Sequence, residues 1–388
     1  MTTVYLIRHA EAEGNLYRRV HGWYDSLITE NGYRQIAALR GRFADVPIDA
    51  VYSSDLFRTM TTARAIYPSH GLELHTTPGL REIGVGVWED KPWGALEREY
   101  ALNLIRFNHC SPEFRVRGGE TFAQVQARIR ETVFRLAAAH PGQTIALFSH
   151  GTAIRCLQAA LRGLGPGEMD GLGHSDNTAV TCLEIQGDQA RIVFENDNSH
   201  LPEEISTLAR QKWWKERDGG GGDANLWFRP LNMKKEADRY RTARHEAWRD
   251  IHGMSVPFDG DGFVKDALRC WRQDPNQAVM WAMRRDEPAG ILQLDLERDA
   301  AQGVGYIPFF YMMPQLRCQG LGVQLLGQAV STFRPLGRTR LRLRCAPDNG
   351  RAQRFYQKHG FVKVGEEQGA RVPLDILEKN IGFETKEE

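Results

Sequence analysis

The sequence has no long uncharged hydrophobic run and no apolar segment of the kind that directs secretion. None of its stretches approaches the ~20 apolar residues that a membrane-spanning helix needs. The amino-terminal segment MTTVYLIRHAEAEGN carries charges where a signal peptide has its apolar core. We therefore expect a cytoplasmic protein that has no membrane partner.

The sequence also lacks an excess of charge of either sign and has no closely spaced cysteines. The chain carries 50 Lys and Arg residues against 49 Asp and Glu residues, a net charge of +1. It lacks the basic excess that binding to nucleic-acid phosphates requires. Its six cysteines are scattered and form no CxxC pair, which excludes a disulfide scaffold and the short ligand spacings of a zinc site. We expect reduced thiols, no nucleic-acid partner and no metal.

The chain does have enough apolar surface for more than one folded domain. Its 388 residues are 41% hydrophobic and 26% charged, which is typical of globular proteins. At about 150 residues per domain they make two or three domains. The clearest break is RDGGGGDAN. A polar helical pattern precedes these glycines and an apolar run follows, which predicts a flexible linker rather than a phosphate loop between strand and helix.

The glycines divide the chain into a first domain (1–216), a linker (217–224) and a second domain (225–388). In the first domain strand patterns alternate with helical patterns, which favours an α/β fold with a largely parallel sheet. The expected strands are Val4–Ile7, Ala50–Ser53 and Thr144–Phe148, and the expected helices are Glu30–Phe43, Arg58–Tyr67, Phe122–His140 and Thr152–Leu161.

The second domain has a different order of elements. One strand and two helices precede three successive strands, which predicts an antiparallel α+β sheet. The expected strands are Leu226–Pro230, Ala278–Arg284, Ala289–Leu296, Val304–Met312, Arg340–Cys345, Phe361–Val364 and Val372–Leu377. The expected helices are Glu236–His252, Gly262–Arg272, Leu321–Phe333 and Arg351–His359.

Polar side chains follow the ends of three expected strands in the first domain. Arg8 and His9 follow the first strand, Arg58 opens a helix after the second, and His150 and Gly151 follow the third. An Arg-His pair at one strand end is ordinary surface chemistry. Three strand ends that offer cations and helix amides together make a site for a phosphoryl dianion.

Further motifs extend this pattern into a resemblance. Glu82 in LREIGVGVWE would alone be a solvated carboxylate. Together with RHAEAEGN, HGWYDSLITENGYRQ, SSDLFRTMTTA, RGGET, SHGTAIR and NDNSHL, this segment resembles the histidine phosphatase superfamily over about residues 3–203. That is the group that includes phosphoglycerate mutase. The resemblance implies a three-layer α/β/α fold, and Ala10 stands where the family usually has glycine.

The resemblance also implies a role for each matched side chain. His9 would attack the phosphorus atom and become a phosphohistidine. The cationic and imidazole side chains Arg8, Arg58 and His150 would hold the phosphoryl oxygens. Glu82 would protonate the leaving alcohol and then take a proton from the hydrolytic water. No metal is required.

Three further residues complete the expected phosphate and substrate site. Asn15 matches a family asparagine that contacts the phosphoryl group, and Gly151 lies at a helix start. Trp23 lines a leaving-group pocket with Tyr24, Trp88, Trp93 and Phe107, unless these aromatic residues simply pack. The expected substrate is a small-molecule phosphate ester. Hydrolysis is favoured over mutase action because the segment 90–118 is short and lacks the basic cluster of the mutases.

In the second domain, YMMPQLRCQGLGVQLL joins an expected strand to an expected helix. Glycines at a helix start let backbone amides approach a diphosphate, which the helix dipole also favours. Such a loop alone is an ordinary turn. With DNGRAQRFYQKHGF it resembles the GNAT N-acetyltransferase superfamily over about residues 225–380. The resemblance implies a mixed, mostly antiparallel sheet, acetyl-CoA as cofactor and an amine, small-molecule or peptide, as acceptor.

This resemblance also implies which residues meet the cofactor. The backbone of Tyr311, Met312 and Met313 would lie along the pantetheine chain. Tyr356 would donate a proton to the departing thiolate, and Asn349 would hydrogen-bond the cofactor. The expected diphosphate contacts are the amides of Arg317, Cys318, Gln319, Gly320, Leu321, Gly322 and Val323.

The general base of the acetyl transfer has several candidates. No carboxylate occurs in Gly303–Met313, which leaves a water chain, Glu297 or an amine that is already neutral. Cys318 would sense oxidation only if its pKa fell. We expect a bifunctional enzyme. The alternatives are a phosphatase regulated by an acyl-CoA-sensing domain and an amino-terminal phosphoglycerate-type mutase, with the oligomeric state left open.

Overall fold

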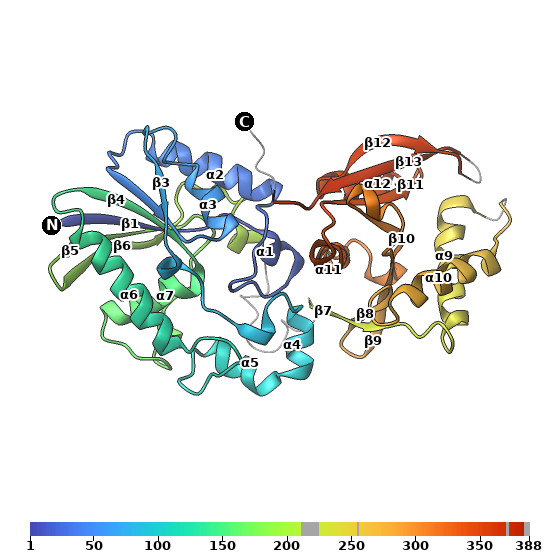
Figure 1. Cartoon of the computed structure of the whole chain (residues 1–388), viewed down its shortest axis with the longest axis horizontal. Helices are drawn as coiled ribbons and strands as arrows, with labels where there is room; N and C mark the ends of the chain where they lie inside the picture. Colours follow the sequence, from blue (N-terminus) through green and yellow to red (C-terminus); the bar gives the residue numbers. More distant parts are fainter. Residues whose placement is uncertain (211–224, 254–255, 370–371, 384–388) are drawn as a thin grey trace. The chain divides into compact units, whose positions relative to one another are not determined.

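The computed structural model describes residues 1–210, 225–253, 256–369 and 372–383. The chain separates into two compact units, Met1–Lys91 with Leu96–Gly221 and Pro92–Ala95 with Gly222–Glu388 (Figure 1). The expected linker, 217–224, lies outside the described residues. Among the helices in the described part of the chain, none has both the length and the hydropathy to cross a bilayer.

A six-stranded sheet in the order β3-β2-β4-β1-β5-β6 forms the centre of the first unit. The four strands from β3 to β1 are parallel to their neighbours, and β5 and β6 add an antiparallel edge. The strands are β1 (Thr2–Arg8), β2 (Ala50–Ser53), β3 (Leu74–Thr76), β4 (Thr144–Ser149), β5 (Val180–Gln186) and β6 (Gln189–Asp197). The parallel part was predicted, whereas β5 and β6 were not identified in the sequence.

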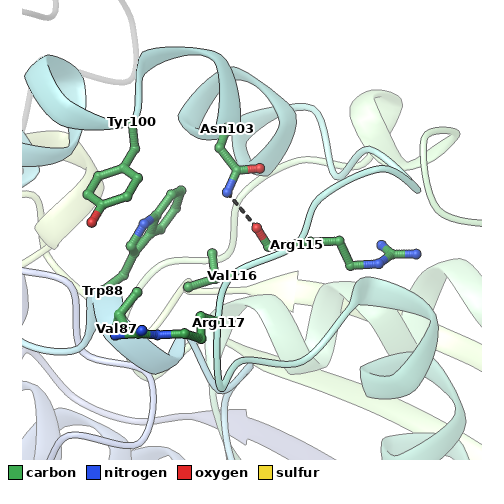
Figure 2. A pocket seen from close by; sticks show the side chains of 7 residues that line it. All are labelled: Val87, Trp88, Tyr100, Asn103, Arg115, Val116 and Arg117. Atoms are coloured by element: carbon green, nitrogen blue, oxygen red, sulfur yellow. Dashed lines mark hydrogen bonds between the residues drawn. The ribbon is translucent and has the colours of Figure 1, made fainter.

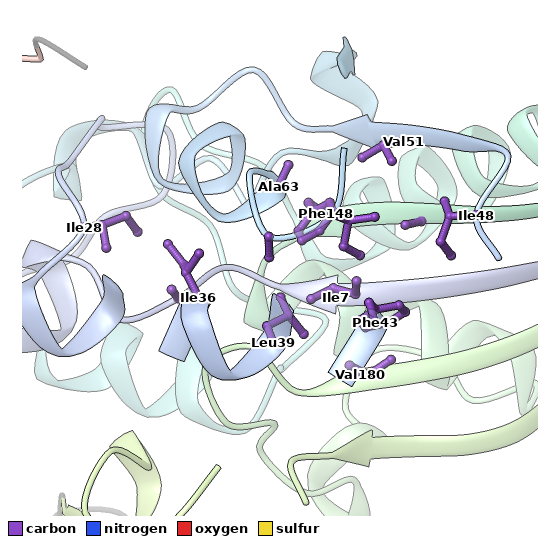
Figure 3. Close-up of a cluster of buried hydrophobic side chains, with 14 of the residues drawn as sticks. Ile7, Ile28, Ile36, Leu39, Phe43, Ile48, Val51, Ala63, Phe148 and Val180 are labelled. Atoms are coloured by element: carbon purple, nitrogen blue, oxygen red, sulfur yellow. The ribbon is translucent and has the colours of Figure 1, made fainter. Parts of the chain in front are cut away.

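Helices cover both faces of this sheet and complete a three-layer α/β/α fold. On one face, apolar residues of α2 and α3 pack on the strands, and Leu39 and Phe43 meet Ile7 and Phe148 (Figure 3). On the other face α6 and α7 pack on each other and on β1. The α-helices of the unit are α1 (Glu13–Tyr17), α2 (Glu30–Phe43), α3 (Phe57–Ala63), α4 (Trp93–Glu99), of which Trp93–Ala95 group with the second unit, α5 (Ala101–Asn108), α6 (Phe122–Ala138), α7 (Gly151–Leu161) and α8 (Thr207–Arg210).

Local sequence explains where these helices begin and end. Thr29 caps α2 by accepting the amide of Gly32 at 3.0 Å, and Thr121 caps α6 through a reciprocal pair with Gln124. Helix α3 ends at Ala63 rather than at the expected Tyr67. The amides of Arg64, Ala65 and Ile66 bond carbonyls three residues earlier, the tighter 3₁₀ pattern that often ends a helix.

The second unit contains a seven-stranded sheet in the order β12-β13-β11-β10-β9-β8-β7. Only the pair β10 and β11 is parallel among the described pairings, which confirms a mixed, mostly antiparallel sheet. The strands are β7 (Leu226–Pro230), β8 (Val279–Arg284), β9 (Glu287–Asp295), β10 (Val304–Met312), β11 (Arg340–Cys345), β12 (Val362–Glu367) and β13 (Leu374–Asn380).

Two pairs of helices cover this sheet. Tyr240 of α9 and Val264 of α10 share a core with Phe309 and Tyr311 of β10. The intervening residue of β10, Phe310, faces the opposite side and meets α12. The α-helices of the unit are α9 (Ala237–His252), α10 (Gly260–Gln273), α11 (Gly322–Phe333) and α12 (Gly350–Lys358).

Candidate active sites

His9 follows β1 directly and is held by the neighbouring strand. Its backbone amide donates to the carbonyl of Ser149 at 3.0 Å, and Nδ1 of its buried ring lies 2.7 Å from the carbonyl oxygen of Ala10. Because a carbonyl only accepts, Nδ1 carries the ring proton and Nε2 keeps its lone pair. Burial, with Arg58 and Arg8, holds the pKa of His9 well below its usual value. The imidazole is therefore neutral and suited to nucleophilic attack.

His150 lies beside His9 because β1 and β4 are parallel, with Arg8 opposite Ser149 in register. The centroids of the two imidazole rings are 5.2 Å apart. Nε2 of His150 is 2.8 Å from the hydroxyl of Ser54, and burial is the main cause that lowers the pKa of His150 well below its usual value. Nδ1 is buried and has no hydrogen-bond partner among the described residues. This nitrogen atom fits a phosphoryl oxygen.

Arg8 brings a second unpartnered nitrogen atom to the same place. Its Nη1 donates to the carbonyl of Ser175, whereas its Nε is buried and has no partner within the described part of the chain. Gly151 makes room for this guanidinium, since a Cβ at that position would lie 3.2 Å from Nε of Arg8. A cation thus lies against the first turn of α7, where helix amides favour an anion.

Arg58 supplies the other cation of the site from the first turn of α3. It is 1% exposed, and its donors are held by the backbone of one loop. Nη1 donates to the carbonyl of Tyr24 at 3.0 Å, and Nη2 donates to those of Gly22 at 2.6 Å and His21 at 3.4 Å. These carbonyls offset the cost of burying the guanidinium.

The carboxylate of Glu82 faces the start of α7, next to His150. Oε2 accepts the amide of Thr152 at 3.0 Å, and Oε1 accepts the amides of Ala153 and Ile83, both at 2.9 Å. Glu82 also interacts electrostatically with both buried arginines of the site. The structure thus brings together five residues that the sequence predicted from separate segments: Arg8, His9, Arg58, Glu82 and His150.

Trp23 borders the Glu82 loop. Its side chain is partly exposed, with 44% of the residue accessible, and its indole N–H donates to the carbonyl of Glu82 at 2.9 Å. The guanidinium of Arg81 lies 5.1 Å from the centre of the Trp23 ring. An exposed aromatic surface therefore stands next to the residue expected to protonate the leaving group.

Asn15 and Ala10 have defined positions near the nucleophile. Oδ1 of Asn15 accepts the amide of Ala12 at 3.1 Å, which places this side chain at the start of α1. Ala10 is fully buried, and its amide donates to Thr62 Oγ1 at 3.0 Å. Its φ is not in the left-handed region, so alanine in place of the family glycine causes no backbone strain.

Two of the other expected pocket aromatics, Trp88 and Phe107, pack on each other and on Phe114. Trp88 is fully buried, and its ring centroid lies 6.1 Å from that of Phe107 and 5.5 Å from that of Phe114. A pocket of about 310 Å³ lies beside Trp88 (Figure 2). The residues that line it are Val87, Trp88, Tyr100, Asn103, Arg115, Val116 and Arg117.

The segment before β5 holds Arg8 and His9 in place and was missed in the sequence. The side-chain amide of Asn177 donates to the carbonyl of His9 at 2.9 Å, and the amide of Thr178 donates to that of Arg8 at 3.1 Å. Asp176 is 1% exposed and raises the pKa of Arg8, which burial lowers. The polar run SDNT before an apolar stretch was the available signal.

Arg128 of α6, also missed, fixes the backbone of the Glu82 loop. Its Nη1 donates to the carbonyl of Arg81 at 2.9 Å, and its Nη2 donates to that of Glu82 at 3.1 Å. Glu120 pairs with Arg128 at 2.8 Å and accepts the amide of Gly84 at 2.8 Å. Arg128 and Glu120 thus hold the backbone of the loop on both sides of Glu82.

In the second unit, β10 and β11 separate where the cofactor is expected. They are paired from Val304 and Arg340 to Ile307 and Leu343, although the strands continue to Met312 and Cys345. The backbone of Tyr311–Met313 therefore borders a gap in the sheet. On its other side it is paired with β9, since Met313 donates to Ala289 at 2.9 Å.

The loop that follows β10 presents unpartnered amides. Cys318 and Gly320 have φ values of +61 and +77, a conformation found in anion-binding nests. Among the described residues, no acceptor bonds the amides of 318–323, as expected of a diphosphate cradle at a helix start. The side chain of Arg317 is committed to Asp250 and to the carbonyl of Met312, and its amide donates to the carbonyl of Pro314 at 3.3 Å. The expected diphosphate contact of Arg317 is therefore wrong, and the cradle begins at Cys318.

Tyr356 and Asn349 lie on α12 and at its start. Tyr356 is 7% exposed, and burial raises the pKa of its phenol, which keeps the proton available for donation. Oδ1 of Asn349 accepts the amide of Ala352 at 3.2 Å. Asn349 is thus a helix cap, and its side-chain NH₂ is the group that suits a cofactor carbonyl.

The carboxylates near the end of β10 include Glu246 and Asp250 of α9 but not the expected Glu297. Tyr311 donates its hydroxyl to Oε2 of Glu246, on α9. Glu297 follows β9 at the far end of the ladder, where Asp295 is opposite Tyr306, whereas the cofactor end has Met312 opposite Gly290. The sequence could not identify Glu246, because a helix in another segment supplies it.

Comparison with known proteins accounts for both units. The profile of the histidine phosphatase superfamily (branch 1) matches residues 4–198, just over half of the chain. The profile of the acetyltransferase (GNAT) family matches residues 242–361.

Individual relatives match the first unit. The probable phosphoglycerate mutase GpmB of Yersinia pestis (strain Pestoides F) is 35% identical over 164 residues, 42% of this chain and 76% of that protein. The solved structure of Bacillus stearothermophilus YhfR is 30% identical with a TM-score of 0.50, over 52% of this chain and 99% of that one. A mycobacterial glucosyl-3-phosphoglycerate phosphatase is 25% identical with a TM-score of 0.47, over 50% and 99%. The chain belongs to the histidine phosphatase superfamily and carries a GNAT acetyltransferase domain after its phosphatase-like domain.

Proposed function

We propose that the amino-terminal domain, residues 1–216, hydrolyses small-molecule phosphate esters through a phosphohistidine on His9. One observation carries this proposal. The neutral ring of His9 lies in a cluster with two buried nitrogen atoms, Nε of Arg8 and Nδ1 of His150, that have no partner among the described residues. Buried polar nitrogen atoms of this kind are costly unless a ligand satisfies them. A phosphoryl group offers oxygens to the Nε–H of Arg8, and also to Nδ1 of His150 when Nε2 accepts the hydroxyl of Ser54.

The reaction balances with the residues of the site. Nε2 of His9 attacks phosphorus, the N–P bond forms, and the ester P–O bond breaks as Glu82 gives its proton to the leaving oxygen. Arg8, Arg58 and His150 stabilise the charge on the phosphoryl oxygens. Water then attacks phosphorus and gives a proton to Glu82, the N–P bond breaks, and inorganic phosphate leaves His9 in its neutral form. No step of this sequence requires a metal ion.

Hydrolysis is favoured over phosphate return to a second hydroxyl. The segment Asp90–Gly118 forms the short helices α4 and α5 and their connections. It lacks the long basic insertion that holds a phosphoglycerate in mutases, although Arg98, Arg106, Arg115 and Arg117 occur in it. Trp23, exposed beside Glu82, suits an apolar or aromatic part of the leaving alcohol. The relative named as a probable mutase makes the mutase the second candidate.

A phosphate-release screen tests the proposal. The ester panel contains sugar, nucleotide, amino-acid and cofactor monophosphates, each assayed with the wild-type chain and with His9→Ala. We expect free phosphate from at least one ester, and none from it with His9→Ala. A His9→Ala protein with normal rates contradicts the mechanism, and phosphate that appears on another hydroxyl of the same molecule identifies a mutase.

We also propose that the carboxyl-terminal domain, residues 225–388, transfers an acetyl group from acetyl-CoA to a small-molecule or peptide amine. The supporting observation is the run of unpartnered amides at 318–323 beside the gap between β10 and β11. With acetyl-CoA bound, the amine nitrogen would form a bond to the acetyl carbon as the C–S bond breaks. Tyr356 would protonate the departing thiolate, and a base would take the proton of the amine. Glu246, bonded to Tyr311 at the cofactor end of β10, is the candidate base.

Calorimetry with acetyl-CoA and a thiol-release assay over an amine panel test this second activity. Tyr356→Phe should keep acetyl-CoA binding and lose turnover. If no amine is acetylated, and acetyl-CoA instead changes the phosphatase rate equally in wild type and in Tyr356→Phe, the domain is an acyl-CoA sensor.

A further inference from the structure

Glu89 accepts hydrogen bonds from four backbone amides in the first domain. Oε2 accepts the amides of Gly22 and Tyr24 at 3.0 and 2.8 Å. Oε1 accepts the amides of Trp23 and Val85 at 2.8 and 3.1 Å. Three successive residues of one loop thus turn their N–H groups toward a single carboxylate, as they would toward a bound anion.

The same loop holds Arg58 with its carbonyl groups. Gly22 and Tyr24 each donate an N–H to Glu89 and each accept a hydrogen bond from the guanidinium of Arg58, at 2.6 and 3.0 Å. Two peptide segments therefore connect the carboxylate to the cation. The amide of Val85 extends this connection to the loop that carries Glu82.

The packing around Glu89 leaves little freedom to the loop. A Cβ at Gly22 would lie 2.4 Å from the carbonyl oxygen of Ile83 and 2.6 Å from Oε1 of Glu89. The negative charge of Glu89 also favours the protonated form of Arg58, whose pKa burial lowers. Geometry and charge at Glu89 thus both act on the same guanidinium.

We propose that Glu89 is a positioning residue for Arg58, which it aims at the phosphoryl group through the backbone of residues 22–24. This assignment rests on the proposed function, since it takes Arg58 as a ligand of the phosphoryl oxygens. A carboxylate is required at this position because each of its oxygens accepts two N–H groups. The NH₂ of a glutamine would face two donors and force the loop away.

Glu89→Gln is the first variant that tests the proposal. Because a displacement of about 1 Å can cost about 10²-fold in rate, we expect a fall of that size in kcat/KM for p-nitrophenyl phosphate. An alkyl phosphate that the wild type hydrolyses should lose the same factor, since Arg58 acts on the phosphoryl group whatever the leaving alcohol. The inhibition constant for orthovanadate should rise in parallel.

Glu99→Gln is the matched control. Glu99 lies on α4, pairs with Lys91 at 3.3 Å and has a side chain that is 48% exposed, so the change removes the same charge without touching the loop. Its kcat/KM and orthovanadate inhibition should equal those of wild type. Equal losses in the two variants would assign the effect to general surface charge and overturn the proposal.

A double variant separates positioning from a general effect on the fold. If Glu89 acts through Arg58, adding Glu89→Gln to Arg58→Ala should cost little further affinity for orthovanadate. Calorimetric binding of orthovanadate provides this readout even where turnover is too slow to measure. Losses that multiply in the double variant would show that Glu89 acts independently of Arg58.

Circular dichroism and thermal unfolding establish that each variant is folded. If Glu89→Gln does not fold, Glu89→Asp decides, because a side chain shorter by one methylene keeps the charge and cannot reach all four amides. We expect Glu89→Asp to fold and to lose about tenfold in kcat/KM for both esters. This loss is smaller than the 10²-fold expected of Glu89→Gln, because the charge is kept. A folded Glu89→Asp with wild-type rates and orthovanadate affinity overturns the proposal.

The proposed function and this assignment fail in different ways. If the wild-type chain neither hydrolyses any ester in a His9-dependent manner nor binds orthovanadate, the phosphatase proposal fails and the role of Glu89 fails with it. If the wild type is active and folded Glu89→Gln matches it, only the positioning role is lost.

Discussion

The carboxylate of Glu82 accepts the backbone amide of Thr152 at 3.0 Å. The side chain that exchanges the proton in the proposed mechanism thus caps the helix that begins next to His150. The position of the acid is therefore tied to the backbone of the phosphate site. Variants of Glu82, the proposed acid, and of Arg128, which supports it, can be distinguished from variants of the phosphate site by how the rate depends on the leaving group.

Replacing Glu82 with glutamine keeps the size of the side chain and removes its exchangeable proton. We expect the hydrolysis of an alkyl phosphate to slow by about 10²–10⁴-fold, the usual contribution of a positioned acid. p-Nitrophenyl phosphate should lose much less, because nitrophenolate departs without a proton. Steady-state kinetics on both esters provides the check, and equal losses on the two would argue against an acid role for Glu82.

Arg128 should show a weaker form of the same pattern. It donates to the carbonyl of Glu82, so Arg128→Ala lets the acid move while Arg58 stays in place. We expect a loss of about tenfold for alkyl phosphates, part of the 10²–10⁴-fold that a positioned acid supplies, with unchanged inhibition by orthovanadate. Arg130→Ala, an exposed position on the same helix that stacks on Phe134, is the control and should behave as wild type.

The stability of the first domain should fall in mild acid. Burial is the main cause that lowers the pKa values of His9 and His150 well below their usual value. Below about pH 6.5 the unfolded chain binds protons at these imidazoles and the folded chain does not. The free energy of unfolding therefore decreases as the pH falls from 6.5 toward the folded pKa values.

Urea unfolding at pH 7.5 and pH 5.5 measures this effect. His9→Asn should reduce the loss of stability between the two pH values. His75→Asn, which changes an exposed histidine of β3, should leave it as in wild type. An identical loss in all three proteins would place its origin elsewhere.

Two glycines of the second domain offer a matched test of the cofactor cradle. Gly320 and Gly337 have φ values of +77 and +73, and a Cβ at either position would meet no atom within 4 Å. Alanine should therefore strain both sites alike, by about 1 kcal/mol. Only Gly320→Ala should weaken acetyl-CoA binding, by about tenfold in calorimetry, as expected for about 1.4 kcal/mol. A comparable loss of affinity in Gly337→Ala would indicate a general effect of strain.

The parts of the fold that a sequence reveals are those encoded locally. Apolar runs mark β1 and β4, and residues that follow such runs, Arg8, His9 and His150, can be located because parallel strands end at one edge of a sheet. The hairpin of β5 and β6 was not predicted, because β6 alternates exposed and half-buried residues and has only a weak apolar pattern. The polar run before β5 was missed with it. Because the strands were not predicted, the contact of Asn177 with His9 could not be predicted either.

Supporting residues were missed for a different reason. The role of Glu89 depends on four amides, three of them in a loop far earlier in the chain, and any exposed glutamate would read the same way in the sequence. Glu246 likewise gains its meaning only from Tyr311. Such roles depend on contacts between segments that are far apart in the sequence, so the type of side chain alone does not predict them.

Because β10 separates from β11, the second sheet lacks backbone hydrogen bonds between these strands beyond Ile307 and Leu343. A ligand whose amide groups lie along Tyr311–Met313 would act there as a surrogate strand, and the folded state would gain the free energy of binding. At a hundred times its dissociation constant, such a ligand adds about 2.7 kcal/mol. If acetyl-CoA is that ligand, as proposed, amide hydrogen exchange along this edge should slow as acetyl-CoA is added.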